Sequence, residues 1–502
     1  MRGHTRHVSQ ALVIAAGNGS RLNSDTPKQL LPLLGVPLLA RTLFTLERAG
    51  IEKAYVVLGY RGHEIRRAIE SVRGLGLELH WLYNDEWRQP NGLSVLAAES
   101  DLDEPFILTM TDHLFDPDVV RRLAESAHDL KGIDLAVDYD VDGVFDLDDA
   151  TKVRVESDRI VEIGKTLETY DAIDTGVFLA SPVLFGALRD ARTEGDGSLS
   201  GGVQKLASAG LARVTDIGGR MWHDIDTRED AAEAERKLLA GLRRPTDGPV
   251  ARYINRPISI ALSRRLVRTS VTPNQVSVAT LVLGLVSAGL AALGGYVPFL
   301  LSGLLFQAGS ILDGSDGEIA KLTFSASVRG EWVDTICDNL SYVAFLLGLM
   351  IGVVRSPLPS VYVWSGLVGF AAVSASLANI HVYLRREKES GSALSVQYGW
   401  EEGTDGFRRL MRVLKYFGKR DVMAFEVMLL AIVGQLPLVL PIAGVGATAL
   451  LLPATTVANV RSLWRFRRSH KVIPISTARG DRGWLPEVEP EPVRERAASA
   501  KR

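Results

Sequence analysis

Long apolar runs in the second half of the chain constrain its fold more than any other feature of the sequence. Between residues 276 and 463 long uncharged runs dominate, whereas charged residues are frequent and apolar runs are short before about residue 250. A helix needs about 20 apolar residues to cross a bilayer, and the shorter runs reach that length with their polar extensions. We therefore predict an all-α membrane domain of six transmembrane helices, at Val276–Leu293, Val297–Leu312, Thr335–Val354, Ser360–Leu384, Val422–Leu438 and Pro441–Val460.

Four aspartates surround the connection between the second and third runs, at Asp313, Asp316, Asp334 and Asp338. Residues three or four apart share one face of a helix, so two helices meeting on those faces would gather four carboxylates. Like charges repel unless a cation lies among them, and oxygen ligands suit Mg²⁺ or Mn²⁺. A charge at mid-bilayer costs ~2.5–3.5 kcal/mol, so we expect this cluster to open to water at the interface. The alternative is an ordinary acidic loop between two spans.

The spacing of this stretch, DGSDGEIAKLTFSASVRGEWVDTICD, resembles the signature of the CDP-alcohol phosphotransferase family. The resemblance implies that Asp313, Asp316 and Asp334 hold a pair of metal ions that bridges a diphosphate. It further implies that Asp338 completes the cluster and acts as general base on the acceptor hydroxyl.

The same resemblance assigns roles to three residues between the aspartates. Gly317 and Ala320 would be small because the nucleotide passes close to the helix there. Lys321 would contact the diphosphate or the acceptor phosphate. The family pattern has arginine at that position, and lysine keeps the charge but lacks the planar two-pronged donor.

The first half of the chain alternates predicted strands and helices. The apolar run at residues 11–16 (ALVIAA) stops at a glycine and is typical of a buried parallel strand. Further strands are predicted at residues 54–58, 77–83 and 106–110, and helices at 37–49, at 62–72 and from about residue 92. This order favours a doubly wound α/β sheet, in which ligands bind at the carboxyl ends of the strands.

Two candidate ligand-binding segments follow predicted strands. The first is Gly17-Asn18-Gly19-Ser20-Arg21-Leu22 with Lys28 downstream, in which glycines let backbone N–H groups approach a phosphate and Arg21 and Lys28 supply positive charge. Leu22 holds the third glycine position of a dinucleotide fingerprint, so that motif is excluded. The second is Thr111-Asp112-His113, directly after the strand at 106–110.

These segments, with Trp222-His223-Asp224-Ile225-Asp226-Thr227, resemble nucleotidyltransferases of the sugar-nucleotide type. The resemblance implies that Arg21 and Lys28 hold a triphosphate and that Asp112 and Asp226 bind Mg²⁺, with Asp224 as a rival ligand. It places Lys165 on the acceptor phosphate, where the alternative is a solvated surface lysine; for Asp112 the alternative is a helix cap. The implied nucleotide-binding positions are Ala15, Ala16, Gly17, Gly19, Arg21, Lys28, Asn91 and Gly92.

Net charge and cysteine content bear on the partners and the covalent or metal cross-links that the chain can have. The net charge of −2 gives no argument for a nucleic-acid partner, and the single cysteine, Cys337, excludes an internal disulfide and a cysteine-based zinc site. Residues 252–268 hold five arginines and no acid. This segment fits either a basic helix on anionic headgroups or a cationic lining for a phosphate substrate, with Arg264 as a candidate contact.

We expect four segments along the chain. Residues 1–240 form a nucleotidyltransferase-like domain, 241–252 a proline-containing linker, 253–468 the membrane domain and 469–502 a disordered tail. Residues 385–420 hold nine Lys/Arg against five Asp/Glu, and residues 461–471 hold five Lys/Arg and no acid. Since basic loops stay in the cytoplasm, we predict a multi-pass protein of the cell membrane with the soluble domain and both termini cytoplasmic. No secretory signal peptide is visible.

The two halves suggest consecutive reactions, since a nucleotidyltransferase makes a nucleotide-activated alcohol and a CDP-alcohol phosphotransferase consumes one. Residues 9–465 resemble the bifunctional enzymes that pair inositol-1-phosphate cytidylyltransferase with CDP-inositol:inositol-phosphate transferase. The resemblance implies that CTP and inositol-1-phosphate give CDP-inositol, which reacts with an inositol phosphate to form phosphorylated di-myo-inositol phosphate, a compatible solute, and CMP. It also implies a lipid bilayer around the second domain and a possible homodimer through it.

Three alternatives remain from the sequence. The first is a phospholipid-type CDP-alcohol phosphotransferase that uses a different CDP-activated alcohol. The second is a membrane-tethered scaffold with decayed sites, against which the intact aspartates argue. The third is a transporter, which the clustering of intramembrane charges at one face disfavours.

Overall fold

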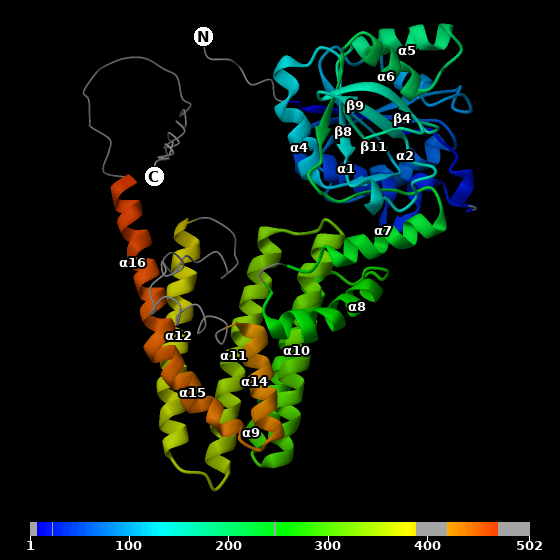
Figure 1. Cartoon of the computed structure of the whole chain (residues 1–502). Coiled ribbons are helices and arrows are strands. Elements are labelled where there is room, and N and C mark those ends of the chain that lie inside the picture. The colour runs from blue at the N-terminus through cyan, green and yellow to red at the C-terminus, as the bar shows by residue number, and fades with distance from the viewer. Residues whose placement is uncertain (1–7, 23, 245–246, 388–418, 470–502) are drawn as a thin grey trace.

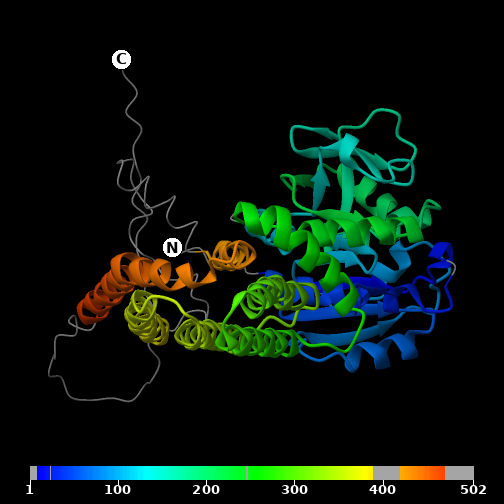
Figure 2. The ribbon, with the colours of Figure 1, turned by 90° about the horizontal axis from the view of Figure 1, so that it is seen from below.

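The computed structural model describes residues 8–22, 24–244, 247–387 and 419–469. An α/β domain stands above one end of a bundle of long helices, and α7 (Arg228–Ala240) and α8 (Arg256–Leu266) lie between the two (Figure 1). Viewed along the bundle, the α/β domain covers the side of α8 and α10 (Tyr296–Leu322), while α12 (Val361–Glu387) and α16 (Leu452–Ser469) extend away from it (Figure 2). The predicted tail and most of the 385–420 segment fall outside the described residues.

The α/β domain is built on a nine-stranded sheet of order β5-β4-β1-β6-β11-β8-β12-β10-β9. Four strands at one end, β5, β4, β1 and β6, are parallel as predicted, but β11 runs antiparallel to both β6 and β8, so the sheet is mixed. The strands are β1 Gln10–Ala15, β4 Lys53–Leu58, β5 Glu78–Tyr83, β6 Phe106–Met110, β8 Ile133–Asp138, β9 Lys152–Glu156, β10 Arg159–Gly164, β11 Ala172–Ala180 and β12 Ala212–Asp216.

Helices cover both faces of this sheet. In β1, Ala11 and Val13 pack into the core under α1, α2 and α4, whereas Leu12 and Ile14 pack into the core under α3, α5 and α6. Burial on both faces explains why the strand is an unbroken apolar run instead of an alternating one. The helices are α1 Leu38–Ala49, α2 Gly62–Glu70, α3 Gly92–Leu96, α4 Pro117–Glu125, α5 Val183–Thr193 and α6 Leu199–Ser208.

Two small strand pairs complete the domain. β7 (His113–Phe115) pairs with β13 (Trp222–Asp224) in an antiparallel register that sets Asp224 opposite His113. β2 (Pro32–Leu33) pairs with β3 (Val36–Pro37) just before α1. The first pair matters for function because it brings the segment after β6 next to a segment more than a hundred residues later.

The second half is helical, as predicted. α9 (Pro273–Leu293) begins with a capping box, in which the Thr272 and Gln275 side chains each accept a bond from the other residue's N–H. The following helices are α10 Tyr296–Leu322, α11 Val328–Arg355, α12 Val361–Glu387, α14 Arg420–Ile432, α15 Val439–Gly446 and α16 Leu452–Ser469.

Five stretches among the described residues are long and apolar enough to cross a membrane, where the sequence predicted six spans. They are Pro273–Leu293, Tyr296–Leu322, Val328–Arg355, Val361–Tyr383 and Leu436–Trp464. The remaining predicted span, Val422–Leu438, falls mostly on α14, whose 13 residues are shorter than a bilayer-crossing helix. The length and apolar composition of these helices favour a membrane-embedded second half.

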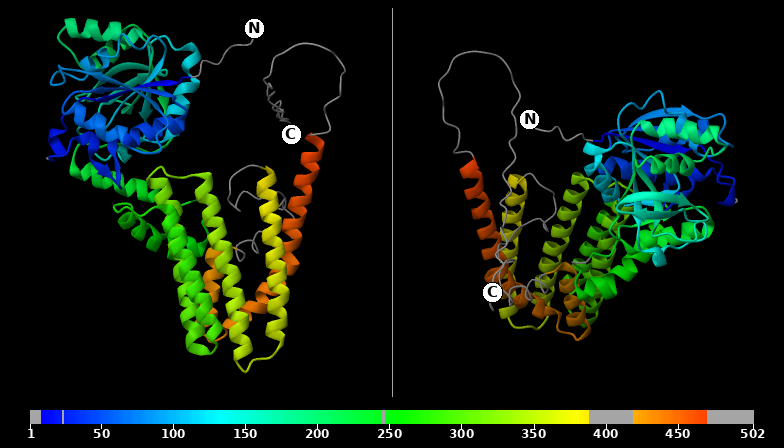
Figure 3. Two further views of the ribbon diagram at one scale, coloured as in Figure 1. Left: turned by 180° about the vertical axis from the view of Figure 1, so that it is seen from behind. Right: turned by 45° about the horizontal axis from the view of Figure 1, so that its top comes forward.

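The two halves contact each other through the connection between α10 and α11. The Phe324 ring stacks on Phe44 of α1 with centroids 5.0 Å apart, and the Arg48 guanidinium lies 4.4 Å from the Phe324 centroid. Buried Arg41 donates to the Leu33 carbonyl at 2.8 Å and to the Leu322 carbonyl at 3.1 Å. The rear and tilted views show the α/β domain beside the green helices at one end of the bundle (Figure 3). The α/β domain is therefore docked on the helix that carries Asp313 and Asp316.

Candidate functional sites

The glycine turn after β1 packs tightly against Lys28. Gly19 has φ +61°, and a Cβ placed there would lie 2.5 Å from the Lys28 Cβ, so only glycine fits without displacing the lysine. Gln29, which the sequence analysis did not single out, donates to the carbonyls of Ala15 at 2.7 Å and Gly17 at 2.8 Å. These bonds hold the turn in place at the carboxyl end of the strand.

Lys28 contacts two aspartates that come from distant segments of the chain. Its Nζ lies 2.8 Å from Asp112 Oδ2 and 2.6 Å from Asp226 Oδ1. Burial lowers the pKa of Lys28, but Asp112 and Asp226 outweigh burial and raise that pKa above its usual value. In the same way burial raises the pKa of the Asp112 carboxyl, but Lys28 and His113 hold it well below its usual range. The site is thus charged at neutral pH.

A second acidic group lies beside this lysine. His113 Nδ1 is 2.9 Å from Asp112 Oδ1, and His113 Nε2 is 3.9 Å from Asp224 Oδ2. Ligand atoms of Asp112, His113 and Asp224 lie within 4.8 Å of one another. Asp224 Oδ1 is buried and has no hydrogen-bond partner among the described residues. A buried carboxylate oxygen without a protein partner is suited to bind a cation.

The two candidate ligands Asp224 and Asp226 therefore differ in their surroundings. Asp226 is engaged by Lys28 and by Arg21, whose Nη2 lies 3.1 Å from Asp226 Oδ2. Burial raises the pKa of Asp224 to about 6, although His113 acts against that rise. Burial lowers the pKa of His113, but Asp224 and Asp112 outweigh it and raise that pKa to about 9.

A cavity of about 820 Å³ opens beside these groups. Asn91 lines it and accepts a bond from the Leu199 N–H at 2.9 Å, so its Oδ1 is already used by the fold. Gly92 approaches the Gly197 carbonyl so closely that a Cβ would lie 2.5 Å from that oxygen. Lys165 also lines the cavity, and its Nζ lies 2.8 Å from Asp149 Oδ1. The predicted positions around Arg21, Lys28, Asn91 and Lys165 thus converge on one region.

The second site lies where α10 meets α11. Ligand atoms of Asp313, Asp316 and Asp334 lie within 4.8 Å of one another, as the spacing on two helices predicted. Asp334 Oδ1 and Asp338 Oδ1 are buried without a hydrogen-bond partner among the described residues. The donor set is all oxygen, so the cluster fits a hard divalent cation.

Two partners of this cluster were not identified from the sequence. Arg420, the first residue of α14, lies 2.5 Å from Asp313 Oδ1 and also ion-pairs with Asp338. Ser277 of α9 donates to Asp316 Oδ2 at 2.6 Å. Arg420 was counted only as one of many loop charges, and Ser277 carried no signal, because both contacts join segments far apart in the chain.

Four further positions were predicted to contact the substrates of the second site, and the structure places them as follows. Lys321 donates to the Gly241 carbonyl at 2.8 Å, so it ties α10 to the end of α7 instead of lying among the carboxylates. Arg264 contacts Glu235 of α7 at 3.4 Å and likewise serves the contact between the two halves. A Cβ at Gly317 would meet no atom of the described residues within 4 Å, and Ala320 is half-buried one turn further along.

The α8 segment is anchored by a buried carboxylate. Glu318 of α10 accepts from Arg256 Nη1 at 2.6 Å and from the hydroxyls of Ser259 and Ser263, each at 2.7 Å. The side of the basic segment that carries Arg256, Ser259 and Ser263 is therefore bonded to α10. Tyr253 and Ile258 of the same segment are exposed.

Comparisons with known proteins divide the chain in the same way. Residues 11–196 match the family described as MobA-like NTP transferase domain, and residues 270–457 match the family described as CDP-alcohol phosphatidyltransferase.

Several relatives match both halves together. A bifunctional IPC transferase and DIPP synthase of Rubrobacter xylanophilus is 37% identical over 348 residues, covering 68% of this chain and 77% of the relative. A protein of the same name from Thermococcus kodakarensis is 32% identical over 421 residues, covering 84% and 89%. Among solved structures, an inositol-1-phosphate CTP transferase from T. maritima is 28% identical, covers 46% of this chain and 94% of that one, and superposes with a TM-score of 0.42.

Proposed function

Because this chain belongs to the family of bifunctional IPC transferases and DIPP synthases, we propose that it is an enzyme that builds a phosphodiester in two transferase reactions. In the first, CTP and inositol-1-phosphate give CDP-inositol and pyrophosphate. In the second, CDP-inositol and an inositol phosphate give phosphorylated di-myo-inositol phosphate and CMP. The observation that supports this most directly is the presence of two separate acidic clusters, one in each half of the chain, each with at least one buried carboxylate oxygen that has no hydrogen-bond partner among the described residues.

The first reaction takes place in the cavity of the soluble domain. A phosphate oxygen of inositol-1-phosphate attacks the α-phosphorus of CTP, a new P–O bond forms, and the bond to the leaving pyrophosphate breaks. Arg21 and Lys28 neutralise the triphosphate, Lys165 holds the acceptor phosphate, and Asn91 and Gly92 line the base pocket. The protein contributes mainly alignment and charge neutralisation to this reaction.

Asp112 with Asp224 or Asp226 would hold a Mg²⁺ ion in this site. The geometry favours Asp224, because its Oδ1 has no hydrogen-bond partner in the described part of the chain, while Asp226 binds Lys28 and Arg21. Bound Mg²⁺ would neutralise charge that develops on the phosphates. We infer that Asp226 acts by holding the cationic side chains of Arg21 and Lys28 in place.

The second reaction takes place at the cluster of α10 and α11. Asp313, Asp316 and Asp334 would hold Mg²⁺, with Mn²⁺ as a substitute, and the bound metal would supply positive charge for the diphosphate of the donor. Asp338 removes the proton from the acceptor hydroxyl, which attacks the phosphorus attached to inositol while CMP leaves. Arg420 lies against Asp338 and Asp313, where it can balance the negative charge of the cluster.

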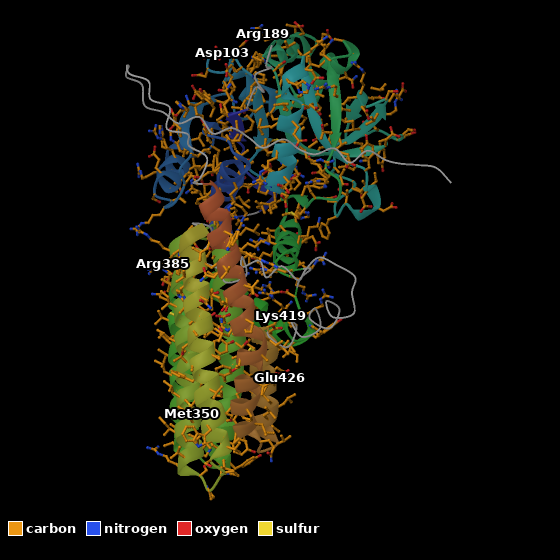
Figure 4. The ribbon with its side chains drawn as sticks, turned by 90° about the vertical axis from the view of Figure 1, so that its left-hand side faces the viewer. Asp103, Arg189, Met350, Arg385, Lys419 and Glu426 are labelled. Atoms are coloured by element: carbon orange, nitrogen blue, oxygen red, sulfur yellow. The ribbon has the colours of Figure 1, made fainter. Side chains whose placement is uncertain are left out.

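We further propose that α14 takes part in a sixth crossing and that the soluble domain faces the cytoplasm. In Figure 4, Arg385 lies at the end of the bundle nearer the soluble domain, and apolar Met350 lies toward the opposite end. Charged residues at the soluble-domain end support a cytoplasmic face there. Exposed Trp364 and Trp464 would face lipid or a second copy of the chain in a homodimer.

Incubation of the purified protein with CTP, Mg²⁺ and inositol-1-phosphate tests the proposal, with the products identified by mass spectrometry. We expect CDP-inositol, and we expect its conversion to the phosphorylated diester when inositol phosphate is in excess. A product that forms only when a lipid is added would support a phospholipid-type transferase instead. Absence of both reactions would refute the enzymatic proposal.

A further inference from the structure

The Asp149 carboxylate contacts both Arg21 and Lys165. In the proposed first reaction, Arg21 binds the triphosphate and Lys165 binds the acceptor phosphate. Asp149 Oδ2 lies 2.6 Å from Arg21 Nη1, and Asp149 Oδ1 lies 2.8 Å from Lys165 Nζ. All three side chains line the same cavity. Arg21 follows β1 and Lys165 follows β10, so each oxygen of one carboxylate serves a cation from a different part of the sheet.

The backbone keeps Asp149 near these cations independently of the ion pairs. Its own N–H donates to Asp146 Oδ1 at 3.3 Å, and the Ala150 N–H donates to the Asp146 carbonyl at 3.2 Å. Lys152 Nζ donates to the Lys165 carbonyl at 2.9 Å and so joins the loop to the strand end that carries Lys165. Loss of the ion pairs would therefore leave the loop attached.

The ion pairs themselves are weak enough to be exchanged. The Arg21 and Lys165 side chains are 54% and 52% exposed and that of Asp149 is 35% exposed. Exposed pairs of this kind shift an equilibrium by no more than about fivefold each. Burial raises the pKa of Asp149, but hydrogen bonds from Lys165 and Arg21 outweigh it and lower that pKa to about 2, so the carboxylate is ionised at neutral pH. A phosphate carries more charge and more acceptor oxygens, so it can displace the carboxylate.

We propose that Asp149 is a positioning residue that occupies both phosphate-binding cations in the free protein and thereby couples binding of the nucleotide to binding of the acceptor phosphate. This inference rests on the proposed function of the cavity. When a triphosphate binds Arg21, the negative charge of the phosphates repels the Asp149 carboxylate, so the contact between Asp149 and Lys165 weakens. The acceptor phosphate then binds Lys165 more readily, and linkage requires the same gain in the reverse order.

Calorimetry on the full-length protein in detergent tests this coupling. The probes are α,β-methylene-CTP, which cannot release pyrophosphate, and inositol-1-phosphate, both with Mg²⁺. For the wild-type protein we expect saturating inositol-1-phosphate to lower the Kd of the nucleotide analogue about threefold to tenfold. For Asp149→Asn we expect the analogue alone to bind about threefold to fivefold tighter than to wild type, and the added inositol-1-phosphate to change its Kd by less than about twofold.

A matched variant, Asp148→Asn, removes the same charge from an exposed neighbouring side chain and should retain the wild-type values. If Asp149→Asn shows the wild-type Kd and the wild-type response to inositol-1-phosphate, the coupling is refuted and the proposed function stands. Weaker binding of the analogue by Asp149→Asn would also refute it, because Asp149 would then support the nucleotide site instead of competing for it. Failure of the wild-type protein to bind the analogue would refute the proposed function, and this inference with it.

Discussion

Two aspartates that lie two residues apart, Asp224 and Asp226, have different partners. Asp224 belongs to the short strand β13 and lies opposite His113, with one oxygen free of hydrogen bonds among the described residues. Asp226 follows the strand and contacts Lys28 and Arg21. At the residue scale, the sequence left both aspartates as candidate ligands, and the structure leaves an oxygen of Asp224, but neither oxygen of Asp226, without a partner among the described residues.

Asp224→Asn should therefore raise the Mg²⁺ concentration needed for half-maximal pyrophosphate release by at least roughly tenfold. Asp226→Asn should leave the Mg²⁺ dependence close to wild type and instead raise the KM for CTP, because Arg21 and Lys28 lose their common partner. A Mg²⁺ titration of both variants, with pyrophosphate release as the readout, separates the two roles. An unchanged Mg²⁺ requirement in Asp224→Asn would contradict the assignment.

Asp174 of β11 provides a pH-dependent contribution to stability. Burial raises its pKa from 3.8 to about 6, against the hydrogen bond from the Gly176 N–H. The folded protein therefore holds this proton more tightly than the unfolded chain does. The contribution is largest below about pH 4 and is lost as the pH rises through about 6.

Asp174→Asn keeps an oxygen acceptor for the Gly176 N–H but cannot ionise. We expect its melting temperature to exceed that of the wild type at pH 8 and the difference to shrink at pH 5, because the wild-type carboxyl is largely protonated there. Thermal melts of both proteins at the two pH values measure this difference. A difference that stays constant with pH would show that burial of the charge is not its cause.

At the scale of elements, the connection between α10 and α11 joins the two halves of the chain. Phe324 adopts a left-handed backbone conformation with φ +58° and inserts its ring between Phe44 and Arg48 of α1. The side chains of α1 also reach the first site, since the Thr42 hydroxyl donates to the Thr111 carbonyl at 3.3 Å, next to Asp112. One helix thus contacts both the membrane half and the strand end that carries a predicted ligand.

Phe324→Ala should destabilise this contact by about 1–2 kcal/mol, since the half-buried ring loses its stacking on Phe44 and its cation–π contact with Arg48. We expect the soluble domain to unfold at a temperature a few degrees lower, with less overlap between its transition and that of the helical half. Differential scanning calorimetry measures both effects. Phe145→Ala, which truncates an exposed ring in the cavity loop, serves as the control and should leave the overlap unchanged.

At the scale of the whole molecule, the two carboxylate clusters lie in different folds. One sits at the carboxyl ends of sheet strands and the other between two apolar helices, and none of the described residues belongs to both. The helical half needs only CDP-inositol from the soluble half. The two reactions should therefore be separable by mutation.

Asp112→Ala should abolish formation of CDP-inositol, at least about a hundredfold, and leave transfer from supplied CDP-inositol within about twofold of wild type. Asp338→Asn should show the opposite pattern, because it removes the base but leaves the soluble site intact. Separate assays of the two half-reactions on each variant provide the measurement. If either variant loses both reactions, the sites are not independent.

The sequence by itself determined the features that depend on neighbours along the chain. Apolar runs predicted the helical half, strand runs that end at glycine or aspartate predicted the edge of the sheet, and the i,i+3 and i,i+4 spacing predicted that Asp313, Asp316 and Asp334 would meet. Local periodicity is enough for these predictions because it fixes the face of a helix or strand on which each side chain lies.

Only the tertiary structure decided the contacts between distant segments. Arg420 meets Asp338 across 82 positions and Arg21 meets Asp149 across 128, and no local pattern joins either pair. Three further features also depend on contacts between distant segments. They are the antiparallel direction of β11, the hydrogen bond from Lys321 to the Gly241 carbonyl and the packing of Phe324 on α1. The physical reason is that these side chains find their partners only after the helices and strands have packed, and packing depends on the shape of the whole molecule.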